Sequence, residues 1–433
     1  MRGLVVSLVA LAALLPGTVA ADTLTEAMVS AAESNPTLAA QRARLRATRE
    51  ALPQAWAEAL PQLSITGVAQ ARDTDEPFDT PRDEDWDASV SASQLLFGSG
   101  RVLASTRAAR AQIRGAVADY DLTLQTLLLD VTRAYADVRQ AQQVVAARDQ
   151  TVSNLTRLLE YAQAQFDAGV VTRTDVAQSQ ARLAQARTLL VQAQGQLAAS
   201  VQAYLRLVGR PPSDLQPPSA ATGLPPQLDI ALDTAGRQSP VLRSAVADTE
   251  LADANVDVAA AQGRPRVTLE AGQSIGDDFD DDTAESLSDT VGVRVSVPIF
   301  QGGIVRSRTR QQRALRAASN LDLAAAQRVV QEDVTNAWTG LASARAAVES
   351  AREQVEAAEL AYEGVRLEQE TGLRATFEVL EQEQNLLDAR LALAQAERDL
   401  VVAERQLLAS VGSLTVPETS GSEAPEDDGL RGR

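Results

Sequence analysis

The sequence predicts a mainly α-helical fold with a smaller β component, built from one unit that occurs twice. Three observations predict it. Landmarks recur at a near-constant offset of 203 or 204 residues, apolar residues recur four and three apart over very long segments, and shorter segments alternate with a period of two. Each unit is expected to contain a helix, two paired strands, a long helix and a further helix.

The duplication is visible in five landmarks. The matching pairs are Asn35-Pro36 with Ser239-Pro240, residues 60–63 with 264–267, residues 97–100 with 300–303, Gly169 with Gly372, and Val208-Gly209 with Val411-Gly412. The repeats therefore run over 22–209 and 226–412. The Pro-rich segment 210–226 joins them and is expected to be extended rather than helical. The acidic tail over 416–433 is expected to be disordered.

Very long helices are the main expected element of each repeat. The expected long helices cover 101–168, 172–208, 304–371 and 375–411, and the expected shorter ones cover 36–59 and 240–263. A helix of about 68 residues is roughly 100 Å long at 1.5 Å per residue. The first carries one row of apolar side chains, which is typical of a coiled coil: Ile113, Val117, Tyr120, Leu124, Leu127, Val131, Ala134, Val138, Ala141 and Val145, then Val152, Leu155, Leu159 and Ala162.

Four strands are expected, over 62–72, 86–97, 266–276 and 289–300. Each presents one apolar face and one small or polar face, which suits a membrane barrel and equally a half-buried soluble sheet. The strand count decides how many chains a barrel needs. Four strands cannot close, and eight enclose only their own side chains, so a usable lumen requires three chains.

The segments between paired strands are rich in acidic residues. They carry Asp73, Asp75, Glu76, Asp79, Asp83, Glu84 and Asp85 in the first repeat, and Asp277, Asp278, Asp280, Asp281 and Asp282 in the second. A solvated outer loop is favoured over a calcium site, because the turn glycine and ligand spacing of an EF-hand are absent.

Composition argues against an enzyme. The chain has no His, no Cys and no Lys, which removes the usual general base, the thiol nucleophile, the Schiff-base amine and most zinc ligands. No phosphate-binding or dinucleotide-binding glycine motif is present, so no cofactor and no metal are expected. A net charge of −18 disfavours binding to nucleic acid.

The first twenty residues resemble a secretory signal peptide. Arg2 precedes an apolar segment over 4–15, and Thr18-Val19-Ala20 provides small residues at a cleavage site. Residues 1–20 are therefore expected to direct export. The exported protein is then expected to be either soluble or a membrane β-barrel.

Taken in order, the duplicated landmarks resemble the TolC-type outer-membrane efflux and secretion channel family. The residues that carry the resemblance are Ser34-Asn35-Pro36, the 60–63 segment, the 298–303 segment and the Gln165 to Gly169 turn. The resemblance implies a homotrimer in the cell outer membrane, with a twelve-stranded transmembrane β-barrel continued by a twelve-helix periplasmic α-barrel.

The implied function is the passive exit duct of a tripartite efflux or type I secretion system. The implied partners are a periplasmic adaptor (membrane fusion) protein, an inner-membrane transporter of the RND or ABC type, and outer-membrane lipid. Two alternatives are a periplasmic adaptor and a structural coiled-coil protein of the envelope. The duplicated strands disfavour both, because adaptors carry a single helical hairpin framed by short β-domains.

Two helix turns are the candidate site, because Gly169 and Gly372 are suited to end helices in the left-handed conformation. The resemblance implies that Arg374 bonds to Thr174 and Asp175 of a neighbouring chain and holds the duct closed. It also implies an acidic ring at the constriction, formed here by Glu378 and Glu381, and places Gln369 where family members carry a gate tyrosine. From the residues alone, Asp175 and Glu378 complement helix dipoles and Arg374 is a solvated turn residue.

Overall fold

The computed structural model describes residues 22–73, 82–278 and 286–416. The expected signal peptide over 1–20, the expected tail beyond residue 416 and most of the two acidic loops lie outside these described residues.

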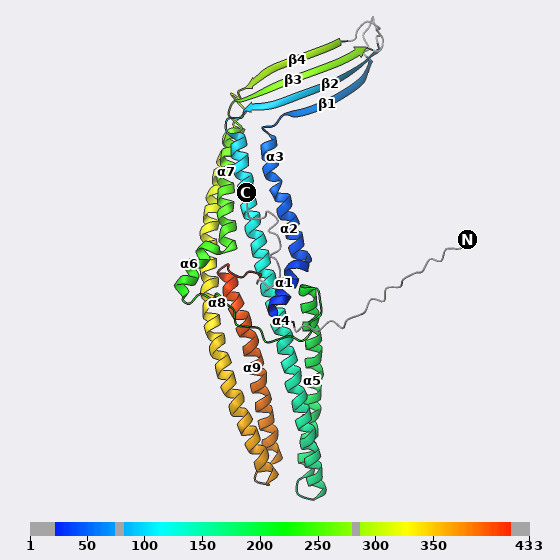
Figure 1. Cartoon of the computed structure of the whole chain (residues 1–433), viewed down its shortest axis with the longest axis vertical. Helices are drawn as coiled ribbons and strands as arrows, with labels where there is room; N and C mark the ends of the chain where they lie inside the picture. The colour runs from blue at the N-terminus through cyan, green and yellow to red at the C-terminus, as the bar shows by residue number, and fades with distance from the viewer. Residues whose placement is uncertain (1–21, 74–81, 279–285, 417–433) are drawn as a thin grey trace, which may run out of the picture.

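The described chain is elongated, with a β-sheet at one end and two long helical hairpins at the other (Figure 1). The helices α4 (Arg101–Asp167) and α8 (Ile304–Glu370) contain 67 residues each and begin directly beneath the sheet. Each turns back at the far end into a shorter helix, α5 (Arg173–Val208) or α9 (Thr376–Ser410). The remaining helices are α1 (Leu24–Ser34), α2 (Pro36–Arg49), α3 (Ala51–Ala57), α6 (Leu228–Gln238) and α7 (Pro240–Ala261).

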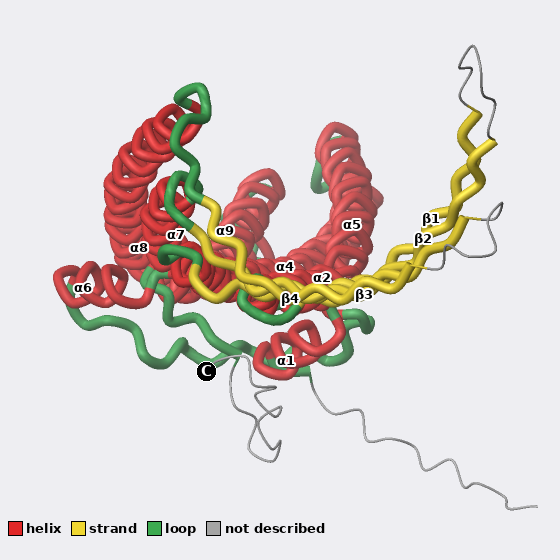
Figure 2. The backbone as a smooth tube through the Cα atoms, turned by 90° about the horizontal axis from the view of Figure 1, so that it is seen from above, coloured by secondary structure: helices red, strands yellow, loops and turns green. Residues whose placement is uncertain are grey.

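The helices form one curved layer rather than a closed bundle. Nearest the sheet, α2 and α3 pack on α4, α4 packs on α7, and α7 packs on α8. Farther from the sheet, α5 replaces α2 and α3 beside α4, while α9 lies between α4 and α8. Viewed along its length, the layer is an open arc (Figure 2). Within the described residues, no helix combines the length and the apolar character needed to cross a lipid bilayer.

The sheet joins the two repeats in the order β1-β2-β3-β4, with every pair antiparallel. Its central contact is β2 with β3, where Ala92 lies opposite Ala271. The outer strands β1 and β4 each pair on one side only among the described residues. The strands are β1 (Gln62–Asp73), β2 (Arg82–Phe97), β3 (Arg266–Asp278) and β4 (Ser286–Ser296).

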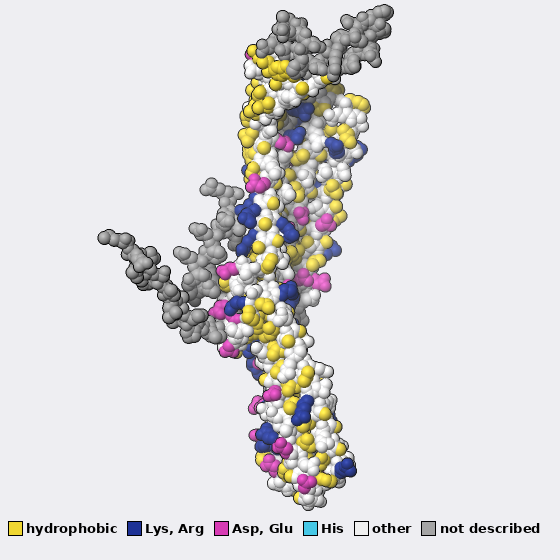
Figure 3. Space-filling model, turned by 90° about the vertical axis from the view of Figure 1, so that its right-hand side faces the viewer, with side chains coloured by type: hydrophobic (Ala, Val, Ile, Leu, Met, Phe, Trp, Pro, Cys, Tyr) yellow, Lys and Arg dark blue, Asp and Glu magenta, His cyan; other side chains and the backbone are white. Residues whose placement is uncertain are grey.

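The two faces of the sheet differ in polarity, because side chains alternate along each strand. The register places Leu63, Ile65, Val90, Ala92, Leu269, Ala271, Val291, Val293 and Val295 on one face. The opposite face carries serines and threonines and an ion pair between Arg294 and Glu270 at 2.6 Å. Apolar side chains gather near the sheet end of the molecule, whereas charges of both signs are scattered along the helices (Figure 3).

Several elements differ from the sequence-based expectation. The helix expected over 36–59 is interrupted at Glu50, because Pro53 has no N–H for the carbonyl of Arg49 and its ring clashes with that carbonyl. The strand expected over 289–300 ends at Ser296, two residues before Pro298, which cannot donate to a sheet. The helices α1 and α6 were not expected, and they precede the Pro-initiated helices α2 and α7 in equivalent places in the two repeats.

At mid-height, α1, the connecting segment 209–227 and α6 run across the long helices, and we call these three segments the belt (Figure 1). The N–H of Asp22 donates to the carbonyl of Asp214 (3.0 Å), and the N–H of Gln216 donates to the carbonyl of Asp22 (3.1 Å). The fully buried Tyr135 hydroxyl lies 2.8 Å and 2.7 Å from the carbonyl oxygens of Asp22 and Gln216. The connecting segment is therefore non-helical, as expected, but fixed to α4.

The largest apolar core lies beneath this belt. It is formed by residues of α1, α4 and α5 together with Leu38 of α2, Leu215 of the connecting segment, and Leu408 and Leu414 of repeat two. A buried Glu404–Arg405 pair on α9 also holds the segment, because Glu404 accepts from the N–H of Ala221 (3.0 Å) and Arg405 donates to the carbonyl of Ser219 (2.5 Å). The belt thus binds both hairpins at the same height.

Candidate functional site

The two helix turns at the free end of the hairpins are built alike. Gly169 and Gly372 have φ angles of +76° and +80°, a conformation that favours glycine. Around Gly169, the N–H groups of Gly169 and Val170 donate back to the carbonyls of Phe166 and Gln165, both at 2.9 Å. Gly372 and Leu373 make the same pair of bonds at 3.0 Å and 2.9 Å, so both turns end their helices in a Schellman arrangement.

The first turn leads into α5, where Thr172 and Asp175 cap the helix reciprocally. The N–H of Thr172 donates to the carboxylate of Asp175 at 2.9 Å, and the N–H of Asp175 donates to the Thr172 hydroxyl at 3.4 Å. The N–H of Thr172 and its hydroxyl (2.8 Å) both donate to the Asp175 carboxylate, and these two hydrogen bonds lower the pKa of Asp175, so it is ionised at neutral pH. Thr174 is exposed beside it, so a hydroxyl and a carboxylate are presented together at the tip.

The second turn presents Arg374 between two acidic residues of its own chain. Its guanidinium donates to Glu368 at 2.8 Å and to Glu378 at 2.5 Å. The bond from Arg374 lowers the pKa of Glu378. Glu381 lies one helical turn farther along α9 and is exposed, so the second turn carries excess negative charge.

One chain does not bring Arg374 to Asp175. Among the described residues, Arg374 forms its ion pairs with Glu368 and Glu378, and Asp175 bonds to Thr172. The expected contact of Arg374 with Thr174 and Asp175 of a neighbouring copy therefore stays a prediction. The Gln369 side chain, at the position of the family's gate tyrosine, is buried.

A polar network above the tip was not predicted from the sequence. Glu383 of α9 is only 4% exposed and accepts from the Asn154 amide of α4 at 3.0 Å and 3.1 Å. Burial, the Glu383 charge and a hydrogen bond to Glu383 raise the pKa of Tyr362 on α8 to about 12. Three helices thus meet at one carboxylate, which ties hairpin α8–α9 to hairpin α4–α5. The sequence carries one sign of this network, because Glu383 is a charged residue in the otherwise apolar row Val379, Leu380, Leu386 and Leu387.

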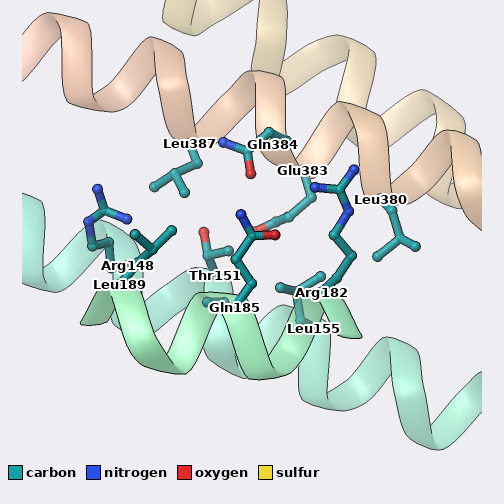
Figure 4. Close-up of a pocket in the computed structure, with 11 residues that line it drawn as sticks. Arg148, Thr151, Leu155, Arg182, Gln185, Leu189, Leu380, Glu383, Gln384 and Leu387 are labelled. Carbon is teal, nitrogen blue, oxygen red and sulfur yellow. The ribbon is translucent and has the colours of Figure 1, made fainter. Parts of the chain in front are cut away.

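A small cleft borders this network between α4, α5 and α9. Figure 4 shows Arg148 and Thr151 of α4, Arg182 and Gln185 of α5, and Glu383 and Gln384 of α9 directed into it. Leu155 and Leu380 also line the cleft, and together with Leu183 they form a small apolar cluster. The lower hairpins are therefore joined by small apolar clusters, the buried Glu383 carboxylate and polar contacts such as Arg398 with Asp137 at 2.7 Å, in contrast to the large core beneath the belt.

Comparison with known proteins identifies the family and the fold. A family model described as outer membrane efflux protein matches residues 27–210 and again residues 231–413. The outer membrane efflux protein BepC of Brucella suis is 31% identical over 418 residues, which cover 95% of this chain and 91% of that protein. The chain belongs to the outer membrane efflux protein family. The resemblance stated from the sequence is thereby confirmed.

Other relatives agree with this assignment. The outer membrane protein TolC of Vibrio cholerae is 27% identical over 405 residues, covering 91% of this chain and 92% of that protein. The solved structure of the outer-membrane channel OprN superposes with a TM-score of 0.79 at 24% identity and covers 91% of both chains, which shows the same fold.

Membership places the chain in the outer membrane as an efflux channel, and the family consists of passive channels rather than enzymes. The double match also accounts for the duplication, because each repeat matches the family model separately. It excludes the two alternatives drawn from the sequence, a periplasmic adaptor and a structural coiled-coil protein.

Proposed function

We propose that three copies of this chain form one continuous exit duct, with a twelve-stranded β-barrel in the outer membrane and twelve helices in the periplasm. The observation that carries the proposal is the four-stranded sheet, whose two outer strands each pair on one side only within the described residues. Its apolar face suits contact with outer-membrane lipid, and its polar face suits a water-filled lumen. Three such sheets supply twelve strands, four more than the eight-stranded barrel that its own side chains fill.

The duct is proposed to serve a tripartite efflux or type I secretion system. Its partners are a periplasmic adaptor protein and an inner-membrane transporter of the RND or ABC type, which select the cargo. The helical hairpins support this assignment, because they extend far beyond the sheet on one side only (Figure 1). In the closed state, Arg374 of one copy contacts Thr174 and Asp175 of the next, while Glu378 and Glu381 form a ring of acids.

The experiment that tests the proposal uses the full chain extracted in mild detergent. Light scattering should give a protein mass near three protomers, and planar bilayers should show discrete conductance steps. A stable monomer or dimer that conducts no ions would contradict the duct.

A cation preference is expected from the acidic tip. Carboxylates gathered at a narrow mouth attract cations and repel anions. In bilayers with a salt gradient, the reversal potential should show K⁺ favoured over Cl⁻, and the double change Glu378→Gln and Glu381→Gln should reduce that preference. The matched control is Glu349→Gln on α8, far from the turns. Anion selectivity in the unmodified channel would refute the acidic ring.

A further inference from the structure

The first turns of α8 are strongly basic, although the chain as a whole has a net charge of −18. No acidic residue lies between Ile304 and Leu321, and the same segment carries five arginines: Arg306, Arg308, Arg310, Arg313 and Arg316. Just before it, the apolar side chains of Ile299 and Phe300 are 94% and 87% exposed. The surface therefore changes from apolar to basic within a few residues, at the sheet end of the molecule.

Two of these arginines have partners within the chain. Arg308 donates to the side chain of Gln262 on α7 at 2.9 Å, and Arg316 pairs with Asp253 on α7 at 3.4 Å. The other three are exposed and form no ion pair or side-chain hydrogen bond with any residue that the structure describes. We call these three, Arg306, Arg310 and Arg313, the basic patch.

The acids of α7 near the sheet do not neutralise the basic patch, because α4 occupies them. Asp257 pairs with Arg107 of α4 at 3.6 Å, and Glu250 pairs with Arg114 of α4. The duplication makes the comparison direct, since Arg107 is the counterpart of Arg310 at the offset of 203 residues. The same position is thus neutralised in repeat one and left charged in repeat two.

The basic patch lies on the same side of the helical layer as the belt. Arg313 precedes Val334 by three heptads and Leu341 by four. Positions seven apart on a helix drift by only about 20° per heptad, so these residues share one side of α8. Val334 and Leu341 are buried in an apolar cluster with α6 of the belt, and the belt lies on the convex side of the arc (Figure 2). The patch is therefore on the outer surface of the layer.

We propose that the basic patch binds the phosphate of an anionic phospholipid, of the phosphatidylglycerol type, in the periplasmic leaflet of the outer membrane. A guanidinium group matches a phosphate in charge and can donate two parallel hydrogen bonds to it. Ile299 and Phe300 then contact the acyl chains beside the headgroup. The inference rests on the outer-membrane location and the periplasmic side proposed for the helices, and it does not depend on the number of copies.

The position of the patch along α8 fits this partner. Arg306, Arg310 and Arg313 lie about 3, 9 and 14 Å from the start of the helix at 1.5 Å per residue. The headgroup layer extends roughly 5 to 8 Å beyond the hydrocarbon core of a bilayer. A long arginine side chain bridges the remaining distance, because it can direct its charge toward the interface along its apolar stem.

Native mass spectrometry of the full chain in mild detergent tests the proposal. The unmodified channel should retain phosphatidylglycerol in preference to phosphatidylcholine with the same acyl chains. The triple change Arg306→Gln, Arg310→Gln and Arg313→Gln should weaken the apparent affinity for phosphatidylglycerol at least roughly tenfold, since each basic residue near a charged lipid contributes separately. The fold should be unaffected, because these side chains have no partner among the described residues.

A second triple change is the matched control. Arg328→Gln, Arg345→Gln and Arg352→Gln remove the same charge from α8 at about 36 Å or more from its start, beyond the reach of the membrane. This variant should bind phosphatidylglycerol like the unmodified channel. Equal losses in the two triple variants, or equal retention of both lipids by the unmodified channel, would overturn the lipid site and leave the proposed duct intact.

Two further measurements identify the occupant of the patch. Inorganic phosphate in large excess should displace little phosphatidylglycerol, because the acyl chains also contribute to binding. Complete displacement would show a general anion site and overturn the proposal. In planar bilayers with a salt gradient, the patch variant should keep the reversal potential of the unmodified channel. A shift of that potential, together with unchanged lipid retention, would place the arginines in the lumen and also overturn the proposal.

Discussion

Replacing Arg374 with alanine should raise the open probability of the channel by roughly ten- to a hundredfold, because three copies of one contact break together. A single exposed ion pair shifts such an equilibrium only a few-fold. The Arg374 side chain is 47% exposed, which fits this weak individual contribution. Single-channel recording in planar bilayers measures the change, and the melting profile of the trimer should remain unaltered.

The competing partners of Arg374 provide the control. Asp175→Asn keeps an acceptor for the N–H of Thr172 but removes the charge, so it should also open the channel. Combined with Arg374→Ala, it should add little, because both changes remove one interaction. Glu368→Gln removes one of the two partners of Arg374 within the chain and leaves Asp175 unchanged, so the channel should stay closed. Fully additive effects of the first two changes would show that Arg374 and Asp175 act separately.

Gly412→Ala should destabilise the protein by about 2–5 kcal/mol, through a strained backbone and a steric overlap. Gly412 follows α9 with φ of +82°, and an added Cβ would lie 2.6 Å from the carbonyl oxygen of Gln238 and 2.9 Å from the Cα of Ser239. Both are backbone atoms at the α6–α7 junction, so the steric overlap can be relieved only if that junction moves. The urea midpoint of the helical circular dichroism signal in detergent should fall accordingly.

Other glycines of the chain separate the two contributions. Gly223 has φ of +78° with no atom within 4 Å of an added Cβ, so Gly223→Ala should cost only the backbone strain, about 1 kcal/mol. Gly209 is the counterpart of Gly412 in repeat one, and a Cβ added there would lie 3.2 Å from the movable Ser34 hydroxyl. The loss of stability caused by Gly209→Ala should therefore lie between those of the other two changes. If all three changes lowered the urea midpoint equally, steric overlap at the α6–α7 junction would have no role.

The fold class was predictable because duplication and periodicity leave a strong signal in the sequence. The single apolar row predicted along α4 includes residues that are buried, such as Val131, Val138 and Leu155. It omits Leu128 and Tyr135, which are completely buried. Both lie beside the row, since α4 packs on one side against α5 and on another against α1 and the belt. A single coiled-coil row assumes that α4 packs against one partner helix, so it does not identify residues of α4 that are buried against other elements.

Less of the candidate site was predictable. Gly169 and Gly372 were identified because a left-handed turn restricts the residue type. The partners of Arg374 were not, because several acids lie within reach of a long side chain and sequence spacing does not choose among them. Similarly, Glu383 occupies an apolar-row position, and only the packing of three helices shows that Asn154 and Tyr362 surround it.

The belt makes each hairpin a lever clamped near its middle. From Tyr135, fixed beneath the belt, to the end of α4 at Asp167, the helix extends about 48 Å at 1.5 Å per residue. One degree of tilt at that clamp therefore displaces the tip by roughly 0.8 Å over this arm. A rotation too small to disturb the close packing around Tyr135 is thus amplified into ångströms of travel at the mouth. The tip can therefore be displaced by a tilt at the belt that requires no movement of the sheet.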